Sequence, residues 1–138
     1  DPPSAESVRE LRRHARAEIA SVAGHLRRVG DASIAAGSSK TFKQLARIAG
    51  AAPSAEGIYV PRFLTLSRLT AITDQLASMS STERSKLPGA SEGRAGQLLA
   101  GAIVAEAAMD ILDIDRIAIC PWALREGVIL HRMDGLPA

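Results

Sequence analysis

The stretch that decides the fold is SIAAGSSKTFKQLARIAG, residues 33–50. It begins as a short apolar run, breaks at Gly37 and continues as a helical pattern in which apolar side chains recur at steps of three residues. A strand, a small-residue turn and a helix in this order aim the unpaired N–H groups of the helix start at one point. The stretch therefore predicts an α/β protein whose turn either binds an anion or only connects a strand to a helix.

The turn fails the test for a nucleotide-binding P-loop. The Walker sequence G-x-x-x-x-G-K-[ST] needs a glycine directly before its lysine, where this chain has Ser39, and an outer glycine, where it has Ile34. A nucleotide binder of the P-loop class is thus disfavoured. In the structural alternative, Gly37 supplies a special backbone angle and Ser38 or Ser39 caps the helix.

Composition indicates one globular domain over residues 1–138. The chain is 46% hydrophobic and 23% charged, and its net charge of +2 gives a weak overall field. Only four aromatic residues occur, too few for a platform on which bases stack. We therefore expect no nucleic-acid partner.

The chain is expected to be cytoplasmic. Cys120 is the single cysteine, so no intramolecular disulfide can form, and this agrees with a reducing compartment. No apolar run approaches the roughly 20 residues that span a bilayer, and the first residues lack the apolar core of a signal peptide. No membrane partner is expected.

Apolar periodicity predicts about five or six helices. The longest carries an apolar stripe from Val8 to Val29, with Ser4 and Gly30 at its ends. Further helices are expected over residues 41–49, 66–79, 95–112 and 123–133, and Ser80 with Glu83 forms a capping-box pattern for a short one. The helix over 95–112 is rich in Ala and Gly, which would let it approach neighbouring elements closely in a buried position.

The predicted strands are few. Residues 32–36 and 116–122 read as strands, and residues 58–63 as a short extended segment. Strands that alternate with helices favour a parallel sheet, here a short one of two or three strands covered by helices. Such a sheet is small for a complete α/β domain.

Three separated segments together resemble one family. AAGSSKTFKQLARIAG (35–50) is similar to a G-T-S-G-T turn and its helix, PGASEGRAGQLLAGAIVAEAAM (88–109) to a P-G-[LV]-x-x-x-R-A-D motif with an apolar helix, and IAICPWALREGVILHRM (117–133) to a strand followed by L-R-E-G-L. These three motifs are typical of the exopolyphosphatase and guanosine pentaphosphate phosphohydrolase family of the actin-like ATPase superfamily, which the chain therefore resembles. Their order and approximate spacing also agree with that family.

The resemblance implies a two-lobed parent enzyme. This chain looks like the later portion of the second actin-like (ribonuclease H-like) lobe, because nothing in it matches the D-[IL]-G-G-G-S turn that opens that lobe. The resemblance implies that the first lobe, with its catalytic glutamate, lies outside this chain. The resemblance thus implies hydrolysis of terminal phosphoanhydride bonds of polyphosphate or guanosine pentaphosphate by the parent, a requirement for Mg²⁺ there, and an inactive isolated chain without a cofactor of its own.

The expected phosphate-binding residues are the turn and one arginine: Gly37, Ser38, Ser39, Lys40, Thr41 and Arg94. Lys40 replaces the middle glycine of the family's turn, and a lysine beside a phosphate is chemically sensible as a point charge. Arg94 occupies the arginine position of the family's second motif. A guanidinium at a helix start opposes the helix dipole, so an anion or carboxylate is expected to answer it.

Other charged residues are assigned structural roles. Glu106 and Asp110 are expected on the polar edge of their helix, and Arg125 and Glu126 are expected to hold the last helix by hydrogen bonds and a salt bridge. No set of residues has the spacing of metal ligands. A second function class stays open, a non-catalytic interaction module on a degenerate actin-like fold, with a homodimer as one outcome.

Overall fold

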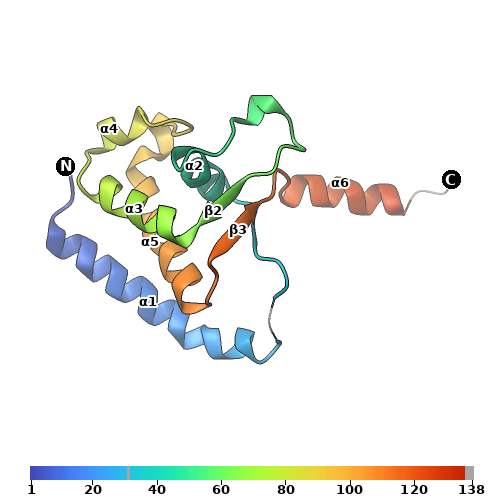
Figure 1. The fold of residues 1–138 in the computed structure, drawn as a ribbon, viewed down its shortest axis with the longest axis horizontal. Helices are drawn as coiled ribbons and strands as arrows, with labels where there is room; N and C mark the ends of the chain where they lie inside the picture. The colour runs from blue at the N-terminus through green and yellow to red at the C-terminus, as the bar shows by residue number, and fades with distance from the viewer. Residues whose placement is uncertain (31, 136–138) are drawn as a thin grey trace.

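The computed structural model describes residues 1–30 and 32–135. Figure 1 shows the helices gathered around a short sheet, with the last helix extending away from them. In chain order the elements are α1 (Ala5–Arg27), β1 (Ala36–Gly37), α2 (Lys40–Ile48), the 3₁₀ turn η1 (Ser54–Glu56), β2 (Phe63–Thr65), α3 (Leu66–Ala77), α4 (Ser81–Ser85), α5 (Glu92–Ile111), β3 (Arg116–Ile119) and α6 (Leu124–Asp134).

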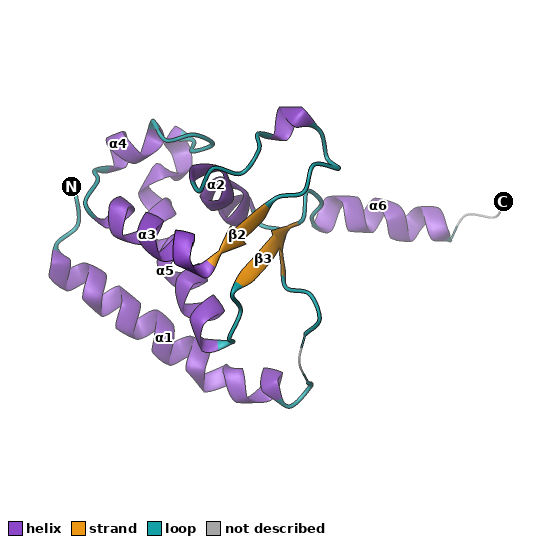
Figure 2. Ribbon diagram, in the orientation of Figure 1, coloured by secondary structure: helices purple, strands orange, loops and turns teal. Residues whose placement is uncertain are grey.

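The sheet has the strand order β1-β3-β2 and is mixed, and Figure 2 shows β2 and β3 side by side. β1 pairs with β3 in parallel, as predicted, but β2 pairs with β3 antiparallel, so the expectation of a purely parallel sheet is wrong. The reason is the segment between α2 and β2, which returns the chain to the edge at which β1 and β3 end. There the Ile119 N–H donates to the Arg62 carbonyl over 2.8 Å, and β2 runs back from that point.

The first strand is shorter than predicted. Only Ala36 and Gly37 pair with β3, and the apolar side chain of Ile34 is 76% exposed. An apolar run becomes a buried strand only where a neighbour covers it. Residues 32–34 are exposed, while Ala35 is half-buried against the core and its carbonyl accepts from the Ala118 N–H. The strand predicted over residues 116–122 is shortened to β3 (Arg116–Ile119). The extended segment predicted over residues 58–63 is shifted along the chain to β2 (Phe63–Thr65).

Helix α5 forms the centre of the molecule. Its buried side chains include Leu98, Ala102, Ile103 and Met109, and it packs against α1, α2, α3 and α4. A Cβ atom built on Gly101 would lie 2.5 Å from Cγ2 of Thr41, so α2 and α5 approach as closely as a glycine permits. The predicted role of small residues in this helix is confirmed.

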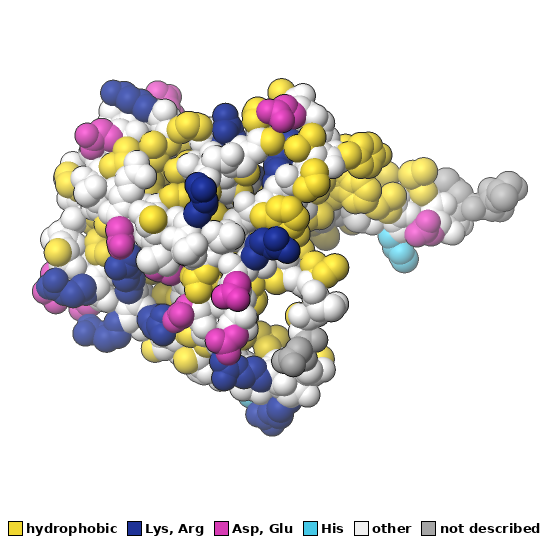
Figure 3. All heavy atoms as spheres, in the orientation of Figure 1, with side chains coloured by type: hydrophobic (Ala, Val, Ile, Leu, Met, Phe, Trp, Pro, Cys, Tyr) yellow, Lys and Arg dark blue, Asp and Glu magenta, His cyan; other side chains and the backbone are white. Residues whose placement is uncertain are grey.

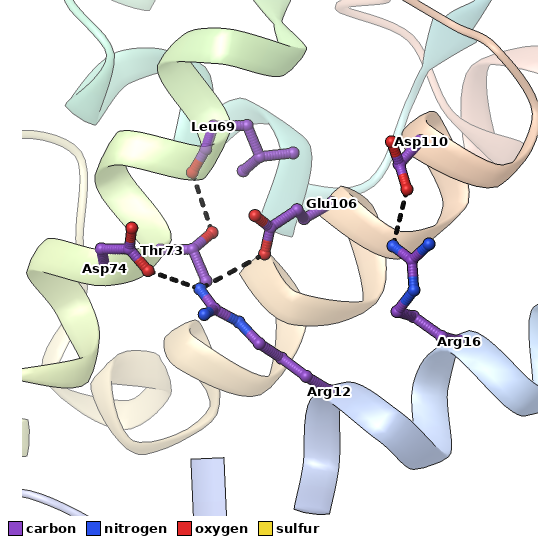
Figure 4. Close-up of polar contacts among 7 residues, drawn as sticks. All are labelled: Arg12, Arg16, Leu69, Thr73, Asp74, Glu106 and Asp110. Atoms are coloured by element: carbon purple, nitrogen blue, oxygen red, sulfur yellow. Dashed lines mark hydrogen bonds and ion pairs between the residues drawn. The ribbon is translucent and has the colours of Figure 1, made fainter. Parts of the chain in front are cut away.

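Helix α1 is attached to the core partly by ion pairs (Figure 4). Arg12 Nη2 lies 2.6 Å from Asp74 Oδ1 of α3 and 3.5 Å from Glu106 Oε2 of α5, and the hydrogen bond that Arg12 donates to Asp74 raises the pKa of Arg12. Arg16 Nη1 lies 2.6 Å from Asp110 Oδ2. The acidic edge of α5 therefore binds another helix, in line with its predicted structural role.

Two helix starts follow the predicted caps, whereas α1 ends at Arg27, before the predicted Gly30. Ser4 Oγ accepts from the Ser7 N–H, and Ser80 and Glu83 form the complete capping box of α4, which lowers the pKa of Glu83. Arg84 is 3% exposed, and its Nε donates to the Leu76 carbonyl at the end of α3 over 2.9 Å. This cation lies at the negative end of the α3 dipole and interacts favourably with it. Burial lowers the pKa of Arg84.

Helix α6 extends from the body with an exposed apolar surface. Figure 3 shows its hydrophobic side chains gathered at the start of the extension. Glu126 accepts from the Ala123 N–H over 2.8 Å, which is a hydrogen bond to the turn before the last helix as predicted, and this bond lowers the pKa of Glu126. The predicted salt bridge of Arg125 is not found with any described residue. In the described part of the chain, no helix is long and apolar enough to cross a membrane.

Candidate functional site

A cavity of about 670 Å³ opens at the edge of the sheet where the parallel strands β1 and β3 end. Ligand sites in α/β proteins commonly lie at the carboxyl ends of parallel strands. The cavity is lined by residues from α2, from the loop that follows it and from the ends of β1 and β3: Ser38, Lys40, Lys43, Gln44, Arg47, Ala51, Ala52, Pro53, Ser54, Gly57, Ile58, Arg62, Gly89, Ile119, Pro121 and Ala123.

The lining carries positive charge without a carboxylate. Four of the residues around the cavity are cations, Lys40, Lys43, Arg47 and Arg62, and none of the described lining residues is Asp or Glu. Low-dielectric walls strengthen the field of such charges inside a cavity. The arrangement favours an anionic ligand over a cationic or neutral one.

Three of the four cations donate to backbone carbonyls. Lys43 Nζ lies 2.6 Å from the Pro121 carbonyl oxygen, and Arg47 Nη1 lies 3.0 Å from that of Ala51. Arg62 donates to several carbonyls of the same loop. Lys40 is different, because its side chain is exposed and has no hydrogen bond or ion pair with a described residue. Lys40 is thus the cation most available to a ligand.

The start of α2 adds backbone donors. Ser39 is the N-cap, its Oγ accepting from the Phe42 N–H over 3.2 Å, and the Lys43 N–H donates to the Ser39 carbonyl. The N–H groups of Lys40 and Thr41 have no acceptor among the described residues. Free N–H groups and the positive helix end would both favour an anion here.

The predicted site residues occupy different surroundings. Ser38 and Lys40 line the cavity, and Ser39 caps α2. Thr41 places its methyl group against α5, and Arg94 is exposed in the first turn of α5 and is not part of the lining. The start of α5 nevertheless adjoins the cavity, because Gln44 Nε2 lies 3.3 Å from Ser91 Oγ.

Gly37 is needed for close packing. It is not among the glycines of positive φ, so the expectation that it supplies a special backbone angle is wrong. A Cβ at this position would lie 2.8 Å from Cγ of Phe42. The glycine therefore allows the first turn of α2 to lie over the end of β1.

Sequence reasoning missed Lys43, Arg47 and Arg62. The first two had a signal, because residues 40, 43 and 47 are spaced by three and four and so share one face of a helix. Arg62 had none, since it lies outside any regular pattern and reaches the cavity through the path of a loop.

The lining does not fit a magnesium ion. Mg²⁺ takes oxygen ligands, carboxylates above all, and the described lining offers cations and apolar groups instead. The described residues also contain no cluster of three or more His, Cys, Asp or Glu side chains. Any metal-dependent step would therefore need ligands from outside these lining residues.

Residues 1–135 match the model of the Ppx/GppA phosphatase family. Proteins named Exopolyphosphatase 1 from Mycobacterium tuberculosis and Mycobacterium leprae are 44% and 42% identical over 134 residues, which is 97% of this chain and 39% and 40% of those proteins. The chain thus spans about two fifths of the length of these curated relatives.

Solved structures share the fold. An exopolyphosphatase from Cytophaga hutchinsonii superposes with a TM-score of 0.81 at 18% identity, covering 99% of this chain and 45% of that one. A Ppx/GppA family member from Aquifex aeolicus gives a TM-score of 0.78 at 23% identity, covering 99% and 44%. The expected fold, α/β and part of an actin-like lobe, is confirmed. The chain belongs to the Ppx/GppA phosphatase family.

Proposed function

We propose that this chain forms one wall of a cleft that binds the phosphate chain of polyphosphate or guanosine pentaphosphate. The observation that carries the proposal is the cavity at the ends of β1 and β3, which holds four cations and no carboxylate among its described lining residues. The names of the curated relatives, exopolyphosphatases, support the same chemistry.

Lys40 and the start of α2 are the proposed contacts to phosphate. A phosphate chain carries close to one negative charge per unit and needs several donors along a groove. The exposed Lys40 side chain and the N–H groups of Lys40 and Thr41 supply them at one end of the cavity. Ser38 adds a hydroxyl there, and Gly37 and Ser39 shape the turn.

We propose that Arg94 extends this surface for longer ligands. It lies one turn of α5 beyond Ser91, which is bonded to Gln44 of the cavity wall. An exposed guanidinium at a helix start favours an anionic neighbour. A short anion would then be held at Lys40 alone, and a longer chain would reach Arg94 as well.

We further propose that the chain is the later portion of the second lobe of a cytoplasmic phosphohydrolase. The parent would hydrolyse terminal phosphoanhydride bonds, with the attacking water, its general base and any Mg²⁺ positioned by residues outside this chain. The isolated chain should therefore bind phosphate chains without hydrolysing them.

Calorimetry at low salt tests the proposal. The chain is titrated with pyrophosphate and with long-chain polyphosphate, beside Lys40→Ala and Arg94→Ala. We expect saturable binding of both ligands, weakened for both by Lys40→Ala and weakened by Arg94→Ala for polyphosphate alone. Absence of saturable heat, or an unchanged affinity in Lys40→Ala, would contradict the proposal.

The second candidate function is an interaction module, and α6 favours it. Leu124, Val128, Ile129, Leu130 and Met133 are all exposed, at 44% or more. An exposed apolar surface of this kind is typical of a protein contact, and a homodimer is one such contact. Sedimentation analysis of the chain and of Val128→Glu checks it: a concentration-dependent dimer that dissociates in the variant would favour this function.

A further inference from the structure

The inference concerns residues 49–62, the cavity loop, which joins α2 to β2. Ala51, Ala52, Pro53, Gly57 and Ile58 of this loop form one side of the cavity. No residue of this described segment is fully buried, although Ala49 and Ala51 near its start lie half-buried against the core. Loops without buried apolar anchors open at low free-energy cost, so the position of this wall depends on its polar contacts.

One side chain supplies most of those contacts. Arg62 Nε donates to the Ala52 carbonyl over 2.7 Å, and Nη2 donates to that of Pro53 over 2.6 Å. Nη1 donates to the carbonyls of Gly57 and Val60, each over 3.0 Å. All three nitrogens of the guanidinium are thus engaged by the loop.

Arg62 is also fixed to the sheet. Its carbonyl oxygen accepts from the Ile119 N–H over 2.8 Å, and the next residue begins β2. The residue therefore joins the end of β3 to four carbonyls of the cavity loop. A planar guanidinium with five donors can hold such a set in one geometry, which a lysine ammonium on a flexible stem cannot.

We infer that Arg62 is a positioning residue for the anion site. It holds the cavity loop at the distance from α2 that gives the cavity its width, and it leaves the anion to Lys40 and the start of α2. This inference rests on the proposed function, since it assigns Arg62 a part in forming that same site.

The experiment separates the charge of Arg62 from its hydrogen bonds. Arg62→Lys keeps the positive charge but removes the planar guanidinium that makes the four hydrogen bonds to the loop. Arg27→Lys is the matched control, because Arg27 Nη2 also donates to a backbone carbonyl, that of Ile111, but Arg27 is exposed, lies in α1 and is outside the lining. Hydrogen exchange of the ligand-free chain and calorimetry with tripolyphosphate are measured for all three proteins.

We expect Arg62→Lys to speed amide exchange in the cavity loop by about tenfold, with the core helices unchanged. Affinity for tripolyphosphate should fall by about fivefold although the net charge is the same. Arg27→Lys should change neither the exchange of the cavity loop nor the affinity for tripolyphosphate.

Two outcomes overturn the inference while the wild-type chain still binds. Unchanged amide exchange in Arg62→Lys would show that the loop does not depend on the hydrogen bonds of the guanidinium. Faster exchange with unchanged affinity for tripolyphosphate would show that the loop does not form the site. If the wild-type chain binds no phosphate compound, the proposed function itself fails, and faster loop exchange in Arg62→Lys would then mark Arg62 as a structural residue only.

Discussion

The cations of α1 and the cations of the cavity are bonded to different kinds of group. On α1, Arg12 and Arg16 lie 2.6 Å from the carboxylates of Asp74 and Asp110, and in Figure 3 basic and acidic side chains are intermixed along this helix. In the cavity, by contrast, Lys43 and the two arginines face backbone carbonyls, and Lys40 has no partner among the described residues.

The contrast separates structural charge from charge available to a ligand. A cation paired with a carboxylate adds little net field and fastens one helix to another. A carbonyl satisfies the hydrogen-bonding donors of a cation but leaves its full charge in place. The cavity therefore keeps its positive field while its walls stay ordered, which is what a site for a phosphate chain requires.

The largest expected effect comes from the contact between α2, which lines the cavity, and α5, which binds α1. Gly101→Val would place a side chain where a Cβ already lies 2.5 Å from Thr41 Cγ2, so α2 must move from α5. We expect a loss of about 1–3 kcal/mol in the free energy of unfolding, measured by urea denaturation. Gly96→Val is the control, since a Cβ there meets nothing within 4 Å; equal losses in both variants would contradict the packing argument.

Lys40→Glu places a carboxylate in the cavity, like the carboxylates that pair with the cations of α1. The affinity for tripolyphosphate should fall by more than about tenfold, or roughly 1.4 kcal/mol, while the free energy of unfolding changes by less than about 0.5 kcal/mol because Lys40 is exposed. Calorimetry and denaturation measure the two quantities. Lys86→Glu, an exposed site outside the cavity, should leave the affinity nearly unchanged; an equal loss there would mean that only net charge matters.

Arg12→Ala removes a cation of α1 that is paired with carboxylates. Its pairs with Asp74 and Glu106 are partly exposed, so we expect a loss of only about 1 kcal/mol in the free energy of unfolding, with phosphate affinity unchanged. Arg13→Ala is the control, because Arg13 is exposed and its ion pair with Glu10 lies within α1 at 3.7 Å. Weaker phosphate binding in Arg12→Ala would show that the two regions are not separate.

The smallest effect concerns pH at the start of α6. The hydrogen bond from the Ala123 N–H holds the pKa of Glu126 below its ordinary value. The stabilising contribution of this bond is therefore complete at neutral pH and is lost as the pH falls through the lowered pKa of the folded state. NMR of the Ala123 amide should show this acid titration, and Glu126→Gln should abolish it. A titration that persists in the variant would assign the effect to another group.

Sequence patterns predicted the helices far better than the strands or the cavity. Helix α1, with its cap at Ser4, and the close approach of α5 through Gly101 follow from local periodicity and residue size. The direction of β2 does not, because it depends on where the cavity loop leads the chain. A strand of two or three residues also carries too little pattern to fix its limits.

The site was predicted only at its turn. Residues 37–41 form a recognisable strand-to-helix connection, and of these Ser38 and Lys40 line the cavity. The opposite wall is made by carbonyls of the cavity loop that Arg62 gathers through four hydrogen bonds. Backbone carbonyls carry no residue-specific signal, so neither the cavity nor the role of Arg62 could be foreseen.

The most direct test of the central claim is a nitrogen-15 NMR titration of the chain with tripolyphosphate. If the cavity binds phosphate, we expect saturable shifts concentrated at residues 38–43 and in the cavity loop, with the amides of α1 unaffected despite its many arginines. Shifts that follow the arginines of α1, or no saturable shifts at all, would contradict the claim that the cavity is the phosphate site.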